Sequence, residues 1–292
     1  MSACFGPDLD PRLLDREPFR FSHRLMGHPA LSLENLGRVL PALPAEQVFY
    51  SRSTRDTGED LDRLHERNRN GLSIEETIEN IRTSDSYVMV RSPESDASFA
   101  SLHRALLDEV ASMIRVRGAG TDVRESMLYL FIASPDSVTP FHIDRYSTLL
   151  LQFRGSKTVT IYPAWDPRVA DQQACEDYVA YAAPRGPRQH PGGEAFGTAF
   201  GFSPGEALHI PFVAGHQVVN GSDDVSISMS IIFKTAETER MRKAMMFNRK
   251  ARQAFSRFGF RPGVVGQAPW RDSMKALAYS GVHRTARLLG SR

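Results

Sequence analysis

Residues 139–157 read TPFHIDRYSTLLLQFRGSK, and this stretch raises the main question about the chain. It places His142 and Asp144 on either side of one isoleucine and then continues through an apolar run to Lys157. Residues two apart in a β-strand project from the same face, so this imidazole and this carboxylate point the same way. Burying a histidine, a carboxylate and a lysine costs free energy unless each finds a partner. We therefore expect these three groups to serve one site.

A metal ion is one partner that would satisfy the histidine and the aspartate. Two ligands do not make a site, and the later strands offer two further histidines, His209 and His216. Two histidines and one carboxylate on one side of an ion, with the other positions open, suit a non-haem Fe(II) that handles O₂. A His-x-Asp pair is common by chance, so a structural histidine beside a surface aspartate is the alternative interpretation.

Lys157 and Thr139 strengthen the metal interpretation. Lys157 begins the strand expected after the RGS turn, so it can return to the same cavity, and Thr139 precedes His142 by three residues. A lysine and a hydroxyl beside an open Fe(II) would bind the distant carboxylate of a chelating acid. The alternatives are a solvated lysine on an edge strand and a turn threonine before Pro140.

The middle of the chain reads as a series of short strands. Turn signals (SPDS, RGS, SPGE and NGSDD) separate the candidates, which are 126–134, 147–153, 157–163, 206–212, 216–220 and 225–233. Such strands with Gly/Pro corners predict an antiparallel jelly roll or barrel. The Pro/Gly-rich insert 163–200 is long for a connection, which predicts a lid, a substrate loop or a disordered segment.

Helices and a mixed region flank this core. We expect an N-terminal mixed α/β flank (1–95), a core (96–236) and C-terminal helices (237–292). The flank contains helix patterns at 31–43, with Ser32 as a cap, and at 73–84, where Ser73 and Glu76 suggest a capping box. Strands are expected at 47–53 and 86–92, and a helix at 98–116.

Charge is unevenly distributed, although the net value is only +2. Residues 237–292 carry thirteen Lys/Arg against three Asp/Glu, about +10, whereas the preceding residues carry 23 basic and 31 acidic side chains, about −8. A basic tail can mark a nucleic-acid arm, a solvated helical face or an oligomer contact. It shows no recognised nucleic-acid docking motif. Its apolar stripe predicts core packing or a homodimer contact through the C-terminal helices, so we favour a homodimer over a nucleic-acid partner.

Composition predicts a globular protein in a reducing compartment. Hydrophobic residues make up 41% of the chain and charged residues 24%, and no run approaches the roughly 20 apolar residues that a membrane helix needs. The acidic, proline-broken N-terminus does not read as a signal peptide. Two cysteines cannot make a disulfide framework or a four-sulfur metal site. We therefore expect a cytoplasmic protein without a membrane partner.

The motif T-P-x-H-x-D, followed by Gln152, Gly155 and Lys157, closely resembles the jumonji C (JmjC) family of the cupin superfamily. The similarity is to its small hydroxylases, such as the asparaginyl hydroxylase that inhibits hypoxia-inducible factor. The later run PGEALHIPFVAGHQVVNGSDDVSISMSIIF resembles the second signature of that family, so the likeness covers roughly 126–234. It implies a mainly β fold with flanking helices: a double-stranded β-helix (jelly-roll) core plus a C-terminal helical segment.

The resemblance also implies roles for individual residues. It assigns His142, Asp144 and His216, rather than His209, as ligands of Fe(II). It implies that Lys157 and Thr139 hold the far carboxylate of 2-oxoglutarate. It places Tyr129 and Phe131 along the wall of the cofactor site. Other 2-oxoglutarate enzymes use an arginine in an R-x-S motif, where this chain has Ser226-x-Ser228, so the anchoring charge is left to Lys157.

The implied activity is that of an Fe(II)- and 2-oxoglutarate-dependent oxygenase, a hydroxylase of a protein, peptide or small-molecule C–H bond that forms succinate and CO₂. Two alternatives remain open. One is a cupin-type metal enzyme that does not use 2-oxoglutarate, for which Lys157 would be dispensable. The other is a non-catalytic regulatory or binding protein, since a fold alone does not decide function.

Overall fold

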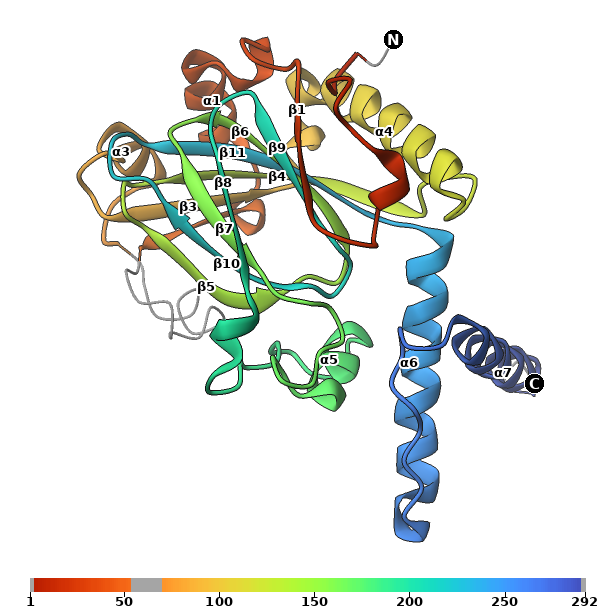
Figure 1. The fold of residues 1–292 in the computed structure, drawn as a ribbon. Helices are drawn as coiled ribbons and strands as arrows, with labels where there is room; N and C mark the ends of the chain where they lie inside the picture. Colours follow the sequence, from red (N-terminus) through yellow and green to blue (C-terminus); the bar gives the residue numbers. More distant parts are fainter. Residues whose placement is uncertain (1–2, 54–69, 290–292) are drawn as a thin grey trace.

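Two antiparallel sheets enclose the centre of the molecule (Figure 1). The computed structural model describes residues 3–53 and 70–289. The larger sheet has the strand order β1-β9-β6-β11-β4-β3-β2, and the smaller one has the order β5-β10-β7-β8. The strands are β1 Phe19–Ser22, β2 Val48–Arg52, β3 Ser86–Arg91, β4 Glu125–Ala133, β5 Val138–Ile143, β6 Ser147–Arg154, β7 Lys157–Ile161, β8 Thr198–Phe202, β9 Glu206–Ile210, β10 Gly215–Asn220 and β11 Ser226–Lys234.

The last eight of these strands form the jelly roll that the sequence predicts. Strands β4, β6, β9 and β11 lie in the larger sheet, and β5, β7, β8 and β10 lie in the smaller one. The chain therefore passes repeatedly from one sheet to the other, as in a double-stranded β-helix. The α-helices around it are α1 Leu33–Val39, α3 Ile74–Glu79, α4 Ala97–Arg117, α5 Gln172–Val179, α6 Ala236–Phe255 and α7 Pro269–Leu289. The expected fold class, mainly β with flanking helices, is confirmed.

Strand β11 shows why the sequence pattern produces two different faces. It is buried along its whole length, and alternate residues contribute apolar side chains to one core cluster: Ile227, Met229, Ile231 and Phe233. The residues between them include Ser228 and Ser230, which turn toward the space between the sheets. Because side chains alternate across a strand, the sequence SISMSIIF gives the larger sheet an apolar outer face and a partly polar inner face.

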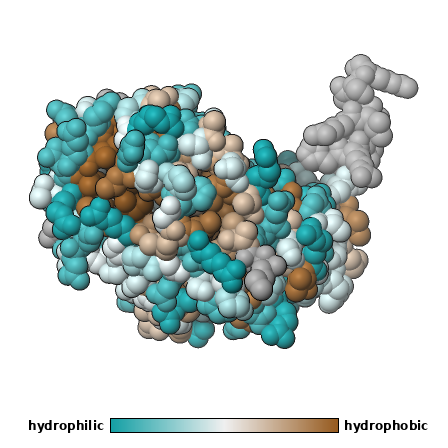
Figure 2. Space-filling model, turned by 90° about the horizontal axis from the view of Figure 1, so that it is seen from above, coloured by the Kyte–Doolittle hydropathy of each residue, from teal (hydrophilic) through white to brown (hydrophobic). Residues whose placement is uncertain are grey.

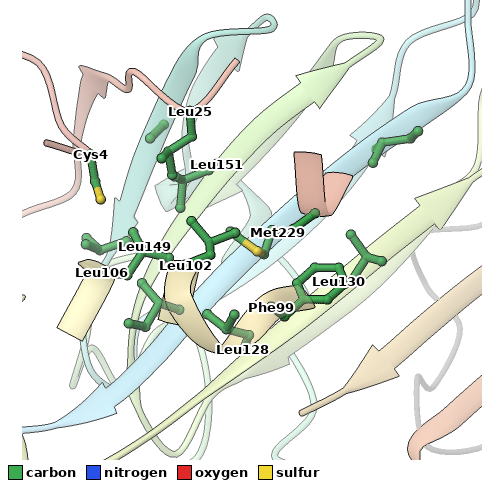
Figure 3. Close-up of a cluster of buried hydrophobic side chains, with 14 of the residues drawn as sticks. Cys4, Leu25, Phe99, Leu102, Leu106, Leu128, Leu130, Leu149, Leu151 and Met229 are labelled. Atoms are coloured by element: carbon green, nitrogen blue, oxygen red, sulfur yellow. The ribbon is translucent and has the colours of Figure 1, made fainter. Parts of the chain in front are cut away.

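Helix α4 covers the apolar outer face of the larger sheet. Leu102 and Leu106 of the helix and Leu128 and Leu130 of β4 are at most 2% exposed and belong to the same cluster. Figure 3 shows these side chains meeting between the helix and the strands. Burying each leucine is worth roughly 1.5–3 kcal/mol. This layer fixes the larger sheet as a rigid wall of the site.

Local sequence signals set several helix ends, and those at Ser32 and Ser73 were expected. The Ser32 hydroxyl accepts a hydrogen bond from the Asn35 N–H at the start of α1 (3.2 Å). Ser73 and Glu76 form a complete capping box at the start of α3. Helix α4 ends at Gly118, whose φ of 74° is accessible to glycine at little cost.

Three elements were not expected from the sequence. Strand β1 has only four residues and is held by pairing with β9, so its pattern is too short to detect. Strand β8 continues past the glycine-containing end of the insert 163–200 and pairs with β7. Helix α5 lies inside that insert, where Asp171 caps it through the Ala174 N–H (2.7 Å). The insert is thus a folded segment, which rules out the disordered alternative.

The N-terminal region contributes directly to the larger sheet. Strands β1, β2 and β3 come from residues before 95 and extend that sheet at both edges. Residues 54–69 of the expected flank lie outside the described ranges. The division at residues 95 and 236 stays a prediction.

The C-terminal helices extend away from the sheets (Figure 1). Helix α6 contacts the insert through Glu176, which accepts hydrogen bonds from Asn248 (2.7 Å) and Arg252 (2.6 Å). Within residues 3–53 and 70–289, no helix has both the length and the apolar character needed to cross a membrane. Figure 2 views the molecule from above, and apolar surface appears there among polar surface. Leu33 of α1 is 62% exposed, and single exposed apolar residues of this kind are normal.

Candidate active site

His142, Asp144 and His216 come together at one end of the smaller sheet. His142 lies on β5 and Asp144 immediately follows it, while His216 lies on β10 directly opposite His142. One ligand atom from each residue lies within 4.8 Å of the others. His216 Nε2 is 3.9 Å from Asp144 Oδ2, and the two imidazole rings have centroids 4.1 Å apart. Two nitrogens and one oxygen at this spacing could hold one divalent ion on one face.

Backbone carbonyls orient both imidazole rings. His142 Nδ1 lies 2.8 Å from the Pro140 carbonyl oxygen, and His216 Nδ1 lies 3.1 Å from that of Ala214. A carbonyl only accepts, so Nδ1 carries the proton in each ring and the Nε2 lone pair is free for a metal. Burial and the neighbouring His142 lower the pKa of His216 to about 4, so it is neutral at pH 7. His216 is therefore in the ligand form.

The Asp144 carboxylate is oriented from the neighbouring strand. The Thr148 hydroxyl of β6 donates to Asp144 Oδ2 (3.1 Å). This contact ties the ligand, which lies just beyond the end of β5, to the larger sheet. Hydrogen bonds of this kind fix which carboxylate oxygen faces the ion.

The triad opens into a cavity of about 390 Å³ between the two sheets. A volume of this size is typical of a small-molecule site. The lining includes His142, Asp144 and His216 at one end and Lys157 and Asn220 of the smaller sheet beyond them. Register places Asn220 opposite Lys157 and His216 opposite Ile161, so the lysine lies four residues, roughly 13 Å along the strand, from the metal ligands.

Lys157 is the only buried cation that lines this cavity among the described residues. It is 6% exposed, and its Nζ donates to the Ser228 hydroxyl of β11 (2.8 Å). In the ranges described, no carboxylate is paired with it, and burial lowers its pKa to about 7. A buried ammonium without a counter-ion is unfavourable. An anionic ligand group bound at the end of the cavity away from the triad would therefore be stabilised by Lys157.

The other expected cofactor residues also line the cavity. Thr139 is 9% exposed, and its side chain is hydrogen-bonded to Tyr87. Tyr129 and Phe131 alternate along β4, and their rings stack with centroids 6.0 Å apart. Thr139 lines the cavity from β5 of the smaller sheet, whereas Tyr87, Tyr129 and Phe131 line it from β3 and β4 of the larger sheet. Desolvation raises the pKa of Tyr87, so its hydroxyl stays protonated and able to donate.

His209 lies elsewhere, with both ring nitrogens already engaged. Its Nε2 accepts from the Asp15 N–H (2.9 Å), and its Nδ1 donates to the Thr148 carbonyl (3.1 Å). The side chain is fully buried. These contacts leave no lone pair for a metal, so of the two later histidines only His216 is placed to complete the triad.

Four further residues line the mouth of the cavity, and the sequence did not reveal the two that belong to the insert. Tyr178 and Tyr181 of the insert line it, and the Arg145 guanidinium lies 3.7 Å and 4.4 Å from their ring centroids. Arg145 Nε also donates to the Tyr178 carbonyl (2.8 Å). Tyr146 lines the same mouth and donates to Glu125 (2.7 Å). Arg145 and Tyr146 follow the His-x-Asp motif directly, which is the one sequence signal that pointed to them.

Ser228 and Asn220 were likewise not identified as site residues. Ser228 was noted only because no arginine occupies the serine-rich strand, and its contact with Lys157 depends on the pairing of the two sheets. Asn220 donates to Ser137, while its buried side-chain oxygen has no partner among the described atoms. A bound ligand with a hydroxyl or amide group would satisfy that oxygen.

No protein-family model matches the chain, and no curated protein matches it. Solved structures of YcfD from Escherichia coli are similar to this chain. The X-ray structure of YcfD aligns with a TM-score of 0.50 at 14% identity, covering 91% of this chain and 62% of that one. YcfD described as a ribosomal oxygenase in complex with cobalt and 2-oxoglutarate aligns at 0.47 and 14% identity, covering 88% and 58%.

This chain therefore spans about 62% of the length of the YcfD chain. A complex of YcfD with cobalt and succinic acid aligns at 0.46 and 13% identity, covering 95% of this chain and 65% of that one. At such identities the likeness concerns the fold. This chain has the same jelly-roll fold with flanking helices as the oxygenase YcfD.

Proposed function

We propose that the protein is an Fe(II)- and 2-oxoglutarate-dependent oxygenase that hydroxylates a C–H bond. The observation that carries the proposal is one cavity with two complementary ends. His142, Asp144 and His216 offer three ligand atoms at one end, and at the other end Lys157 offers a buried amine with which no carboxylate of the described residues is paired. A 2-oxo dicarboxylic acid has a chelating end and a distant carboxylate, so it matches both.

The donor set fits the proposed metal. Two imidazoles and one carboxylate on one face leave further coordination positions open toward the cavity. When bound, Fe(II) would supply the site for O₂ activation coupled to oxidative decarboxylation of the acid. The balanced reaction converts 2-oxoglutarate, O₂ and R–H to succinate, CO₂ and R–OH.

The protein's own residues position the reactants. Lys157 forms an ion pair with the far carboxylate, which restores its protonated state, and Ser228 holds the ammonium in place (2.8 Å). Thr139 donates its hydroxyl to the same carboxylate. Tyr129 and Phe131 close the wall and limit access of water. Proximity and orientation of this kind account for a large part of enzymatic rate enhancement.

The substrate is proposed to approach past Tyr178, Tyr181 and Arg145, because these residues line the cavity and Tyr181 is 54% exposed. A protein side chain, a peptide and a small metabolite all fit the chemistry. YcfD is described as a ribosomal oxygenase, so a protein side chain is the first class to test. The cavity mouth carries both aromatic surface and cations, which suits a substrate with polar and apolar parts.

An anaerobic titration with Fe(II) and 2-oxoglutarate tests this function. The wild-type protein should develop the visible charge-transfer band of the chelate, the band should weaken in Lys157→Ala, and it should vanish in His216→Ala. His103→Ala and Lys275→Ala are matched controls, because these partly buried residues lie outside the cavity lining and should leave the band unchanged. Metal binding without a band would favour a cupin-type enzyme that does not use 2-oxoglutarate. Absence of metal binding would leave a regulatory or binding protein.

We further propose a homodimer formed through the C-terminal helices. Trp270, Met274 and Leu277 recur at helical spacing on α7 and are 68%, 62% and 73% exposed. A second copy would cover this stripe. Light scattering should give a dimer mass for wild type and a monomer mass for Trp270→Ser/Leu277→Ser, with Leu33→Ser of α1 as control. A monomeric wild type would leave the tail available for another partner, and salt-sensitive DNA or RNA binding would identify nucleic acid.

We propose a cytoplasmic location, and the basis is the state of the two cysteine side chains. Cys4 and Cys175 are both free and buried. Burial raises their pKa values to about 11 and about 12, so they stay as unreactive thiols. A chain with this cysteine content suits a reducing compartment. Fractionation of cells expressing the tagged protein would test it.

A further inference from the structure

Asp15, in the N-terminal segment, is a buried carboxylate far in sequence from the metal ligands. Its side chain is 6% exposed. It lies outside the cavity between the sheets, so it contacts neither a metal nor a substrate in the proposed reaction. Its contacts nevertheless lead to the two segments that carry Asp144 and His216.

Three hydrogen bonds join Asp15 to three different strands or turns. Oδ1 accepts from the Phe212 N–H in the turn before β10 (2.9 Å). Oδ2 accepts from the Ser147 hydroxyl at the start of β6 (2.8 Å). The Asp15 N–H donates to His209 Nε2 on β9 (2.9 Å). One residue therefore links β6, β9 and the turn that leads into β10.

The first branch of this network reaches His216. Phe212 is followed by Val213, whose φ of 66° is unfavourable for a β-branched residue, so the turn needs outside support to keep this conformation. The next residue, Ala214, provides the carbonyl that accepts from His216 Nδ1 (3.1 Å). Holding the Phe212 N–H thus holds the carbonyl that orients the His216 ring.

The second branch reaches Asp144. His209 accepts from Asp15 and donates through Nδ1 to the Thr148 carbonyl (3.1 Å). Burial lowers the pKa of His209, which keeps the ring neutral, with its one proton on Nδ1. The Thr148 hydroxyl in turn donates to Asp144 Oδ2 (3.1 Å). Ser147, the neighbour of Thr148, is fixed by Asp15 directly.

We propose that Asp15 is a positioning residue that sets the separation and orientation of Asp144 and His216, and so tunes the affinity of the site for its metal. The inference rests on the proposed function, because it takes the triad to be a metal site. It makes the N-terminal segment before β1 a functional part of the metal centre. Partners beyond the ligands commonly change metal affinity by about 10- to 100-fold when they are lost.

Co(II) titration of the purified full-length protein, followed by its visible ligand-field bands, tests the inference without any turnover. Asp15→Ala removes both acceptors and should raise the Kd for Co(II) by about 10- to 100-fold and alter the bands. Asp15→Asn should restore tight binding, because its oxygen can accept from the Phe212 N–H while its amide donates to Ser147. Asp272→Ala is the matched control: this buried carboxylate accepts from the Gly266 N–H (2.9 Å) in the C-terminal region. It should lower the melting temperature without changing the Kd.

Equal Kd values and unchanged bands for wild type and Asp15→Ala would overturn the inference. So would an equal loss of affinity in Asp15→Asn and Asp272→Ala, because the effect would then follow stability alone. If Asp15→Ala does not fold, Ser147→Ala removes one of the three contacts and should still weaken Co(II) binding; an unchanged Kd there would also refute the role. A wild-type protein that binds no Co(II) would instead refute the metal site on which the proposal rests.

Discussion

Replacing Lys157 with methionine should stabilise the ligand-free protein while weakening 2-oxoglutarate binding. Burial lowers the pKa of this lysine from 10.5 to about 7, and its Nζ donates a hydrogen bond to the neutral Ser228 hydroxyl. Methionine has a similar volume and no charge to desolvate. The residue is therefore expected to be costly for folding and necessary for function.

The magnitude follows from the pKa difference between the unfolded and folded states. Each pKa unit corresponds to about 1.36 kcal/mol, so at pH 7 the buried ammonium costs on the order of 4 kcal/mol. The variant also loses the hydrogen bond to Ser228, which destabilises it by about 1 kcal/mol and offsets part of that gain. Lys157→Met should therefore be more stable than wild type at pH 7, with a free energy of unfolding higher by roughly 3 kcal/mol.

The pH dependence provides a second signature. Between pH 7 and about 10.5 the unfolded lysine binds more protons than the folded one, so wild-type stability rises with pH in this window. The buried thiols of Cys4 and Cys175, with raised pKa values, act in the opposite direction above about pH 8.5. From pH 7 to 8.5 the wild type should gain about 2 kcal/mol relative to Lys157→Met.

Urea unfolding at pH 7.0 and 8.5 measures both quantities, and calorimetric titration with 2-oxoglutarate in the presence of Co(II) measures the functional loss. Lys275→Met is the matched control, since this partly buried lysine has the nearby carboxylate of Asp272 (3.9 Å). A Lys157→Met protein that is less stable than wild type, or that binds 2-oxoglutarate equally well, would refute the reasoning.

Three further outcomes can be measured with the same preparations. Co(II) at 100 times its Kd should stabilise wild type by about 2.7 kcal/mol and leave the melting temperature of His216→Ala unchanged; an equal shift in both would place the metal elsewhere. Arg145→Lys should speed tryptic cleavage within the insert 163–200, because lysine cannot reproduce the guanidinium that stacks on Tyr178. Mass spectrometry would follow the cleavage, and an unchanged rate would show that Arg145 does not hold the insert in place. Leu130→Ala, fully buried under α4, should cost 2–5 kcal/mol in urea unfolding, whereas Leu33→Ala at 62% exposure should cost far less; similar costs would argue against this core.

The sequence predicted the parts of the fold that depend on local pattern. Six strands and one helix could be recognised because the spacing of apolar residues within each segment is typical of that element. These are β4, β6, β7, β9, β10, β11 and α4. The capping box at Ser73 and Glu76 is equally local. By contrast, β1 has four residues and exists because β9 offers it an edge to pair with, so its own sequence carries little signal.

The candidate site divides in the same way. The sequence by itself predicted that His142 and Asp144 project together, because residues two apart in an extended segment share a face and Asp144 directly follows β5. Only the tertiary structure placed His216 opposite His142, left Lys157 without a carboxylate among the described residues, and gave both nitrogens of His209 to other partners. Strand register and burial arise from contacts between residues far apart in the chain. A histidine therefore has the same local sequence signal whether its lone pair meets a backbone N–H or faces an open cavity, and the fold alone decides between them.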